Sequence, residues 1–454
     1  MKWLKRGALA VAALLCVLLA LPFVAPVDDY RPRIERALSE RLKEPVAIER
    51  LRAHVLPAPH VTAEGVRIGK ADDVKIAMLE ITPDVWSLLQ DVKVIRHVEL
   101  SGVRLTLAGA QKLTGAAGAG SASNGGAAKT KGAPLLRVRR VTLSDTVVAV
   151  GKAVAGPFDA SAVMRDDGAL EQVTARLRDG KLNVSLKPEG GRYLLDAHAK
   201  GWRWPVGAPV LFDELTLKGV LTASDFTTST LSSRLCGGTA NGNLTLAWGA
   251  GGKGVRLNGA FDANQLDVAE LAALAASKAG ISGRLNARPA ISATAGSFAG
   301  LVDVLRVETP FQVTNGVFRG VDIRKAATHL LTKDSSGETR FYQLSGHLVM
   351  AAGTKRFTNL KVASGALAAD GNVTVTANRS LSGRVNVQLK AGVVTAASIP
   401  LNVGGTLDAP VLFPTAAAIA GAAAGAAVLG PAGASVGAKV GEWVEGIFGR
   451  GKGK

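Results

Sequence analysis

Histidine, cysteine and serine most often carry metal or nucleophile chemistry, and their spacing in this sequence supports neither. The six histidines never stand at the H-x-x-x-H spacing of a metal-binding helix, and neither Cys16 nor Cys236 has a metal-ligating neighbour. No G-x-S-x-G elbow and no P-loop occurs. The sequence therefore predicts no catalytic residue, no metal site, no cofactor and no enzyme. An enzyme would become the better interpretation if His198 or His347 lay beside a carboxylate in a cleft.

A glycine-rich motif at residues 249–254 does match G-x-G-x-x-G, the pattern of a dinucleotide-binding turn. It joins two predicted strands, whereas the dinucleotide-binding motif opens a helix. We therefore interpret it as a hairpin turn. The acidic pairs at 72–73 and 166–167 lie in predicted turns, and we interpret them as solvated loop residues.

The first residues of the chain predict a membrane anchor. Residues 7–27 form an uncharged run of 21 residues, and at ~1.5 Å per residue such a helix matches the hydrocarbon core of a bilayer. Basic residues precede the run and acidic residues follow it, which predicts a cytoplasmic tail at 1–6 and an extracytoplasmic remainder. The alternative is a cleaved signal peptide, whose apolar region is usually ~7–15 residues long. The centre of the anchor holds Leu14, Leu15, Val17, Leu18 and Leu19.

The formal charge of +18 suggests an anionic partner. Outside the cytoplasm that partner would be acidic lipid headgroups or anionic envelope polymers, so we expect no nucleic acid. The simpler alternative is a basic surface that only confers solubility. Because Cys16 lies in the predicted anchor, Cys236 has no partner for an intrachain disulfide, and stability must come from burial.

Residues 28–108 predict an N-terminal β module. The module begins with an amphipathic helix at 28–42, and from Val46 onward apolar residues alternate with polar ones, as in short antiparallel strands. One short helix is expected at 83–89. The apolar face of the first helix is predicted to hold Ile34, Ala37, Leu38 and Leu42.

Residues 109–134 are nearly all small or polar, which predicts a flexible linker that interrupts a continuous sheet unless strands pair across it. Residues 135–414 return to the two-residue alternation and predict an antiparallel β domain with helical segments at 267–278 and 322–332. Residues 415–454 are rich in Gly and Ala and end in basic residues. Glycines four residues apart predict a helical hairpin there, with an unstructured tail as the alternative.

The strands need a cover for their apolar sides, and the few predicted helices are too short to supply it. Asp179 and Gly180 predict a hairpin turn, after which Leu182, Val184 and Leu186 share one face of the next strand. Two architectures satisfy this pattern. The sheet either folds on itself as a sandwich or curls into a trough whose inner face is open to apolar ligands.

Several segments resemble the AsmA family of envelope proteins, in the same order along the chain. They are the anchor at 7–27, the segment 45–69 with its Leu-Pro-Ala-Pro sequence, the segment 314–323, and the closing segment 399–410. The resemblance covers roughly residues 1–108 and 255–415. It implies a single-pass protein of the bacterial inner membrane, with its N-terminus in the cytoplasm and its bulk in the periplasm, and a role in outer-membrane biogenesis and lipid homeostasis.

The resemblance also implies a relation to bridge-like lipid-transfer proteins, in which a curled antiparallel sheet holds acyl chains in an apolar trough. On that basis we expect phospholipid as the ligand and the inner membrane as the site of attachment. The competing interpretation is an anchored, non-enzymatic scaffold with a closed β core that regulates outer-membrane protein or lipopolysaccharide assembly through outer-membrane assembly components. Strand parity assigns the groove lining to Leu182, Val184, Leu186, Val373, Val375, Val385, Val387 and Leu389.

Overall fold

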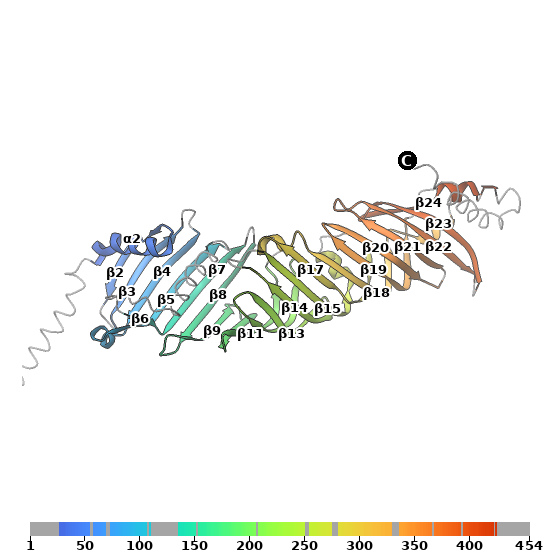
Figure 1. Cartoon of the computed structure of the whole chain (residues 1–454). Helices are drawn as coiled ribbons and strands as arrows, with labels where there is room; N and C mark the ends of the chain where they lie inside the picture. The colour runs from blue at the N-terminus through green and yellow to red at the C-terminus, as the bar shows by residue number, and fades with distance from the viewer. Residues whose placement is uncertain are drawn as a thin grey trace, which may run out of the picture. The chain divides into compact units, whose positions relative to one another are not determined.

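Figure 1 shows the computed structural model of the chain, whose placed elements are almost all strands. The mainly β class predicted from the alternation is therefore confirmed. The chain divides into two compact units, with the boundary between Gly207 and Ala208. The structure describes residues 27–54, 58–69, 73–106, 109, 135–150, 153–205, 208–249, 254–274, 280–328, 336–365, 367–391, 394–421 and 423–424.

The first unit is a curled sheet in which most strands pair with their neighbours in sequence. Two short strands, β1 (Val46–Ala47) and β2 (Arg50–His54), both pair with β3 (His60–Ile68), and the later strands add one after another beyond β3. The later strands are β4 (Val74–Pro83), β5 (Val92–Thr106), β6 (Leu135–Val138), β7 (Arg140–Val150), β8 (Ala153–Met164), β9 (Leu170–Leu177), β10 (Leu182–Glu189) and β11 (Arg192–Arg203).

Parallel pairing joins the strands on either side of the Gly/Ala-rich segment. β5 pairs in parallel with β6 through Val92 and Leu135, and then with β7 from Val98 and Val141 onward. A parallel pair requires a connection that returns from one end of the sheet to the other, and residues 107–134 make that connection. All of this segment except Gly109 lies outside the described residues. Strands do pair across it, so the first unit's sheet continues from β5 to β7.

The second unit is a longer curled meander of antiparallel strands. Its strands are β12 (Leu211–Leu221), β13 (Asp225–Leu235), β14 (Gly238–Ala247), β15 (Val255–Asp267), β16 (Ile281–Ala287), β17 (Ala290–Ala295), β18 (Arg306–Arg319), β19 (Glu338–Ala351), β20 (Thr354–Ala363), β21 (Leu367–Val375), β22 (Leu381–Ala391), β23 (Val394–Thr406) and β24 (Ala409–Pro414). Short β16 and β17 share the space between the long strands β15 and β18. All other strands in this unit pair with their neighbours in sequence.

Few helices accompany these sheets. The first unit has the 3-10 helices η1 (Val27–Tyr30) and η2 (Val85–Leu89) and the α-helix α2 (Arg31–Leu42). The second unit has α4 (Val268–Leu274), η5 (Phe298–Leu301) and α5 (Ile323–Thr328). Residues 416–421 are also helical, and the remainder of the predicted C-terminal hairpin lies almost entirely outside the described residues.

Helix α2 confirms most of the predicted N-terminal helix. Ile34 and Leu42 pack on the buried cluster formed by β1 to β5. The side chain of Glu35 accepts a hydrogen bond from the backbone N–H of Ile48 at 2.7 Å, which fixes the helix on the sheet. Ala37 and Leu38 were predicted on the same apolar face, but both are exposed, because the helix contacts the sheet through a narrower stripe.

The hairpin predicted at residues 179–180 is confirmed between β9 and β10. Gly180 has φ +74°, a left-handed conformation that glycine adopts without strain, and its N–H donates to the carbonyl of Leu177 at 2.9 Å. The side chain of Asp179 accepts a hydrogen bond from the N–H of Lys181 at 3.0 Å, and this bond holds the pKa of Asp179 below its usual value. The glycine motif at 249–254 also joins two antiparallel strands, β14 and β15, as expected.

No helix within the described ranges is both long enough and apolar enough to span a bilayer. The predicted anchor at 7–27, including Leu14, Leu15, Val17, Leu18 and Leu19, lies outside those ranges apart from Val27. The anchor therefore stays a prediction.

Candidate functional site

The register of the second unit brings five predicted lining residues onto one face of its sheet. Val387 pairs with Ala369, and Val385 pairs with Gly371, across β21 and β22. Because side chains alternate between the two faces of a strand, the residues two positions away share that face. The face thus includes Val373, Val375, Val385, Val387 and Leu389. We call it the apolar face of the second unit.

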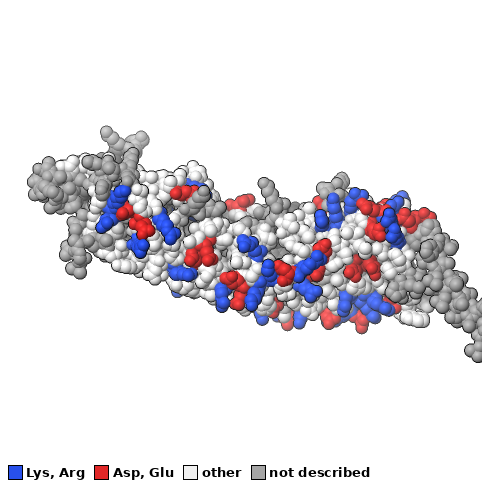
Figure 2. Space-filling view, turned by 180° about the vertical axis from the view of Figure 1, so that it is seen from behind, with Lys and Arg blue, Asp and Glu red and all other residues white. Residues whose placement is uncertain are grey.

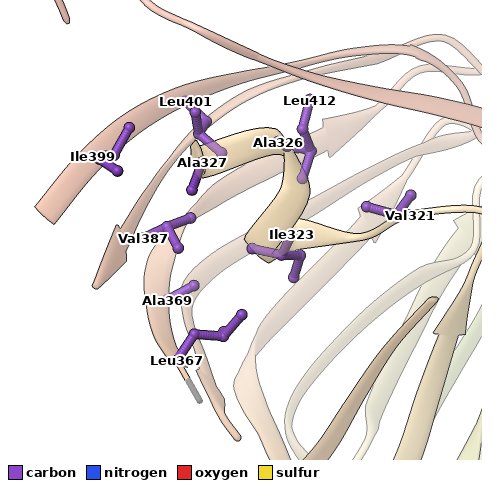
Figure 3. Close-up of a cluster of buried hydrophobic side chains, with 10 residues drawn as sticks. All are labelled: Val321, Ile323, Ala326, Ala327, Leu367, Ala369, Val387, Ile399, Leu401 and Leu412. Carbon is purple, nitrogen blue, oxygen red and sulfur yellow. The ribbon is translucent and has the colours of Figure 1, made fainter. Parts of the chain in front are cut away.

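Helix α5 covers part of this apolar face, as Figure 3 shows. Ala326 and Ala327 of α5 lie against Val387, which is 0% exposed, and against Leu401 of β23. Val375 is also buried, at 2% exposed. At Val387 the face forms a closed core, so a ligand would reach this residue only if α5 moved away.

Away from α5, the apolar face continues as half-buried rows of side chains that cross the strands. One row runs from Leu217 through Leu231 and Gly242 to Phe261. A parallel row runs from Leu221 through Phe226 and Leu246 to Leu257. The residues that alternate with these rows point to the opposite face and are exposed and largely polar, including Lys218, Thr230, Asn243 and Arg256. The two faces of this sheet therefore differ sharply in chemistry.

Glycines opposite phenylalanines shape the apolar face. A Cβ added to Gly242 would lie 2.8 Å from the ring of Phe261, and one added to Gly316 would lie 2.2 Å from the ring of Phe341. Gly346 stands in the same relation to Phe311. Each ring occupies the space that a side chain on the neighbouring strand would fill, an arrangement known to support bent sheets. Aromatic residues are thus used here to fill gaps above glycine.

The first unit has an apolar face of the same construction. Leu182, Val184 and Leu186 of β10 are half-buried and lie opposite Ala199, Ala197 and Leu195 of β11. The row through Val184 continues across the sheet over Ala175, Ala160, Leu143, Leu100, Leu79 and Ala63. Among the described residues, helix α2 covers this face at β1 to β5, where the buried cluster lies.

An open groove of about 700 Å³ lies over β7 to β11, and most of its lining residues are polar or charged, although Ala160, Ala175, Val184 and Leu194 also border it. The register aligns Asp159, Arg176, Asn183 and His198 in one row on the face opposite Val184. Parity predicts a polar face here, but no pattern in the sequence indicates that it is hollowed. The hollow arises from the bending of several strands together, which no single segment encodes.

His198 and His347 each lie beside a carboxylate, the arrangement that would favour an enzyme. His198 Nε2 is 2.7 Å from Asp196 in the polar groove, and His347 Nε2 is 3.2 Å from Glu308. Hydrogen bonds from Arg306 and then His347 hold the pKa of Glu308 below its usual value. All four side chains are between 34% and 56% exposed, as in ordinary surface ion pairs. We assign neither pair a catalytic role.

Within the described ranges, no group of three or more His, Cys, Asp or Glu side chains could hold a metal ion. Comparisons with protein-family models, with curated proteins and with solved structures gave no match for this chain. The candidate site therefore consists of the two apolar faces, and only their geometry supports it.

Proposed function

We propose that the protein binds phospholipid acyl chains on the apolar faces of its two curled sheets and assists lipid transport between the membranes of a bacterial envelope. The observation that carries this proposal is the set of half-buried apolar rows that cross many strands in each unit. A transmembrane anchor at 7–27 would place the sheets in the periplasm, as the resemblance to the AsmA family implies. No covalent chemistry and no cofactor is needed.

The energetics of such binding need no specific pocket. Each CH₂ group removed from water contributes ~0.8 kcal/mol, so ten methylenes against an apolar row contribute about 8 kcal/mol before the costs of ordering. The rows of Leu217 and Leu221 lie four residues apart on β12 and five apart on β13. Between these rows the same face carries Gly219 and the buried Thr228, whose hydroxyl is already hydrogen-bonded to the backbone of Leu244, so an acyl chain can pass from one row to the next without leaving a polar group unpaired, which suits transfer better than tight storage.

The headgroup would stay in water at the edges of the sheets. Figure 2 shows Lys and Arg side chains intermixed with Asp and Glu over one face of the molecule. Charged side chains within the described residues form exposed pairs, such as Arg306 with Glu308 and Arg379 with Asp408. Mixed charge of this kind favours zwitterionic and acidic phospholipids alike, so we expect the acyl chains to dominate affinity.

Variants of the full chain that place an aspartate on one or the other face of the same strand test the proposal. Val184→Asp and Leu244→Asp each place a carboxylate on an apolar face at a half-buried position. We expect native mass spectrometry and lipid extraction to show that bound phospholipid falls by at least about two-fold, because a charge there is costly to desolvate beside an acyl chain.

The matched controls are Asn183→Asp and Thr245→Asp, one residue along the same strands and exposed on the opposite face. They add the same charge and should leave the bound lipid unchanged. Circular dichroism confirms that all four variants stay folded. Equal lipid content in the variants of both faces would sink the acyl-chain proposal.

The second candidate function is an anchored scaffold with a closed β core that regulates outer-membrane assembly. The α5-covered cluster around Val387 favours it, since that part of the apolar face is sealed. The polar groove on the opposite face of the first unit would then be the docking surface. A protein that takes up no added phospholipid, yet no longer supports outer-membrane assembly after His198→Ala or Arg176→Ala, would support the scaffold.

A further inference from the structure

The short helix η2, which connects β4 and β5, carries three exposed apolar side chains. Trp86 is 77% exposed, Leu89 is 85% exposed and Val85 is 46% exposed. Isolated exposed apolar residues are common, but three on one five-residue helix form a concentrated apolar tip. We call Val85, Trp86 and Leu89 the η2 tip.

Hydrogen bonds inside the turn hold the η2 tip in place. Ser87 is buried at 3% exposed, and its hydroxyl donates to the carbonyl of Asp84 at 2.6 Å and accepts from the N–H of Val94 at 2.9 Å. The side chain of Asp84 caps the helix by accepting from the N–H of Trp86 at 3.2 Å. Asp84 and Ser87 thus form hydrogen bonds within the turn, whereas Val85, Trp86 and Leu89 are exposed. A partner that receives the tip meets a preorganised apolar surface.

The η2 tip lies at a defined end of the strands in the first unit. β3 runs from His60 to Ile68, and β4 runs back beside it, so that Ile81 pairs with Val61. η2 follows β4 directly and therefore lies beyond the His60 end of β3.

The first described residues of the chain, before α2, lie toward that same end of the strands. The Ser39 hydroxyl near the end of α2 accepts from the N–H of Val46, which pairs with Ile68 at the far end of β3. Asp28, before α2, accepts instead from the N–H of Leu51, which pairs with Ala63. Passing backward along the chain from Ser39 to Asp28 therefore leads toward the His60 end, where η2 lies.

We propose that the η2 tip is an interfacial membrane contact: Trp86, Leu89 and Val85 enter the boundary between headgroups and acyl chains of the bilayer in which residues 7–27 are anchored. Tryptophan is enriched at this boundary because its ring is amphipathic, and leucine supplies purely apolar area. The proposal rests on the membrane attachment in the proposed function and is independent of lipid binding on the apolar faces.

The partner of the tip is a lipid surface, because the predicted anchor directly precedes residue 28 and the chain before α2 leads toward the strand end that carries the tip. Arg96 lies 3.7 Å from Asp84, and Lys93 stands close to Asp91 in sequence, so the tip's surroundings carry both signs. We therefore expect insertion to depend on apolar contact and to change little with salt. A second contact beside the anchor orients the first unit, with its η2 end at the membrane.

The experiment uses the full chain in phospholipid nanodiscs, with Cys16→Ser and Cys236→Ser removing the native thiols. An environment-sensitive fluorophore is attached after Leu89→Cys, and brominated acyl chains serve as quenchers. The matched control is Val154→Cys, an exposed apolar position at the start of β8. Since β8 ends beside the start of β7 and β6, Val154 lies at the opposite strand end from η2.

We expect blue-shifted emission and quenching at position 89 and water-like, unquenched emission at position 154, in low and high salt alike. Water-like emission at both positions, or equal quenching at both, overturns the proposal. Alkaline extraction distinguishes the absence of the η2 contact from the absence of the membrane anchor. A chain retained in the membrane with position 89 in water overturns only the η2 contact, whereas a chain released by alkali overturns the anchor and the contact together.

Discussion

At the scale of single residues, Cys236 is a thiol whose reactivity reports the folded state. It lies in the turn between β13 and β14, where it is 8% exposed. Burial, followed by the charges of Glu270, Asp213 and Asp267, raises the pKa of Cys236 to about 11. Only the thiolate is reactive, so the folded protein should protect this cysteine strongly.

In a Cys16→Ser chain, we expect a disulfide reagent at pH 8 to modify Cys236 about 100-fold more slowly than after unfolding, from the difference in thiolate fraction alone. The raised pKa also implies stability that is present below the unfolded thiol's pKa and is lost as pH rises from about 9 toward about 11. Modification as fast in the folded chain as in urea would show that the turn is open.

Gly242 tests the packing of glycine against phenylalanine. A Cβ at this position would lie 2.3 Å from the carbonyl oxygen of Ala260 and 2.8 Å from the ring of Phe261, so neighbouring backbone would have to move. We expect Gly242→Ala to lower the free energy of unfolding by about 1–3 kcal/mol and to speed amide exchange in β14 and β15. Gly296→Ala, at a glycine with open space around it, should cost nothing. Equal effects would contradict the packing account.

Individual residues also show which features could be predicted from the sequence. The faces of Leu182 and Val184 followed from parity, because the period of a strand is fixed by its backbone. The turn at Gly180 followed from the left-handed conformation that glycine alone adopts cheaply. Burial of Val387 did not follow, because the residues that cover it, Ala326 and Ala327, lie about sixty positions earlier in the chain.

At the scale of elements, α5 divides the second unit's apolar face into a sealed part and a half-exposed part. We expect Leu401→Ala, at a side chain 0% exposed beneath α5, to lower the free energy of unfolding by about 2–5 kcal/mol and to release amide protection in β22 and β23. Leu231→Ala, on the half-exposed part, removes the same atoms and should cost less than half as much. A reversed order would mean that α5 does not seal the face.

The elements themselves were predictable to different degrees. Helix α2 and the short helix η2 appeared where helical spacing and Pro83 indicated them. The parallel pairing of β5 with β7 was left open by the sequence, because it depends on how a long connection returns across the sheet. The polar groove likewise depends on five strands together, because its lining residues come from β7 to β11.

At the scale of the whole molecule, each unit pairs one apolar face with one polar face, and short helices cover only part of the apolar side. A closed sandwich would bury such faces against a second layer of strands, and within the described residues helices are the cover on these clusters. The half-buried rows that remain are the basis for proposing acyl-chain binding.

The most direct measurement is to map where a lipid lies on the full chain. A phospholipid with a diazirine at the middle of its acyl chain is equilibrated with the protein and photolysed, and cross-linked residues are located by peptide mass spectrometry. The account predicts cross-links at apolar-face residues such as Leu217, Leu231 and Leu257, and none at Lys218 or Thr230 on the opposite face. Cross-links spread evenly over both faces, or confined to residues 7–27, would contradict it.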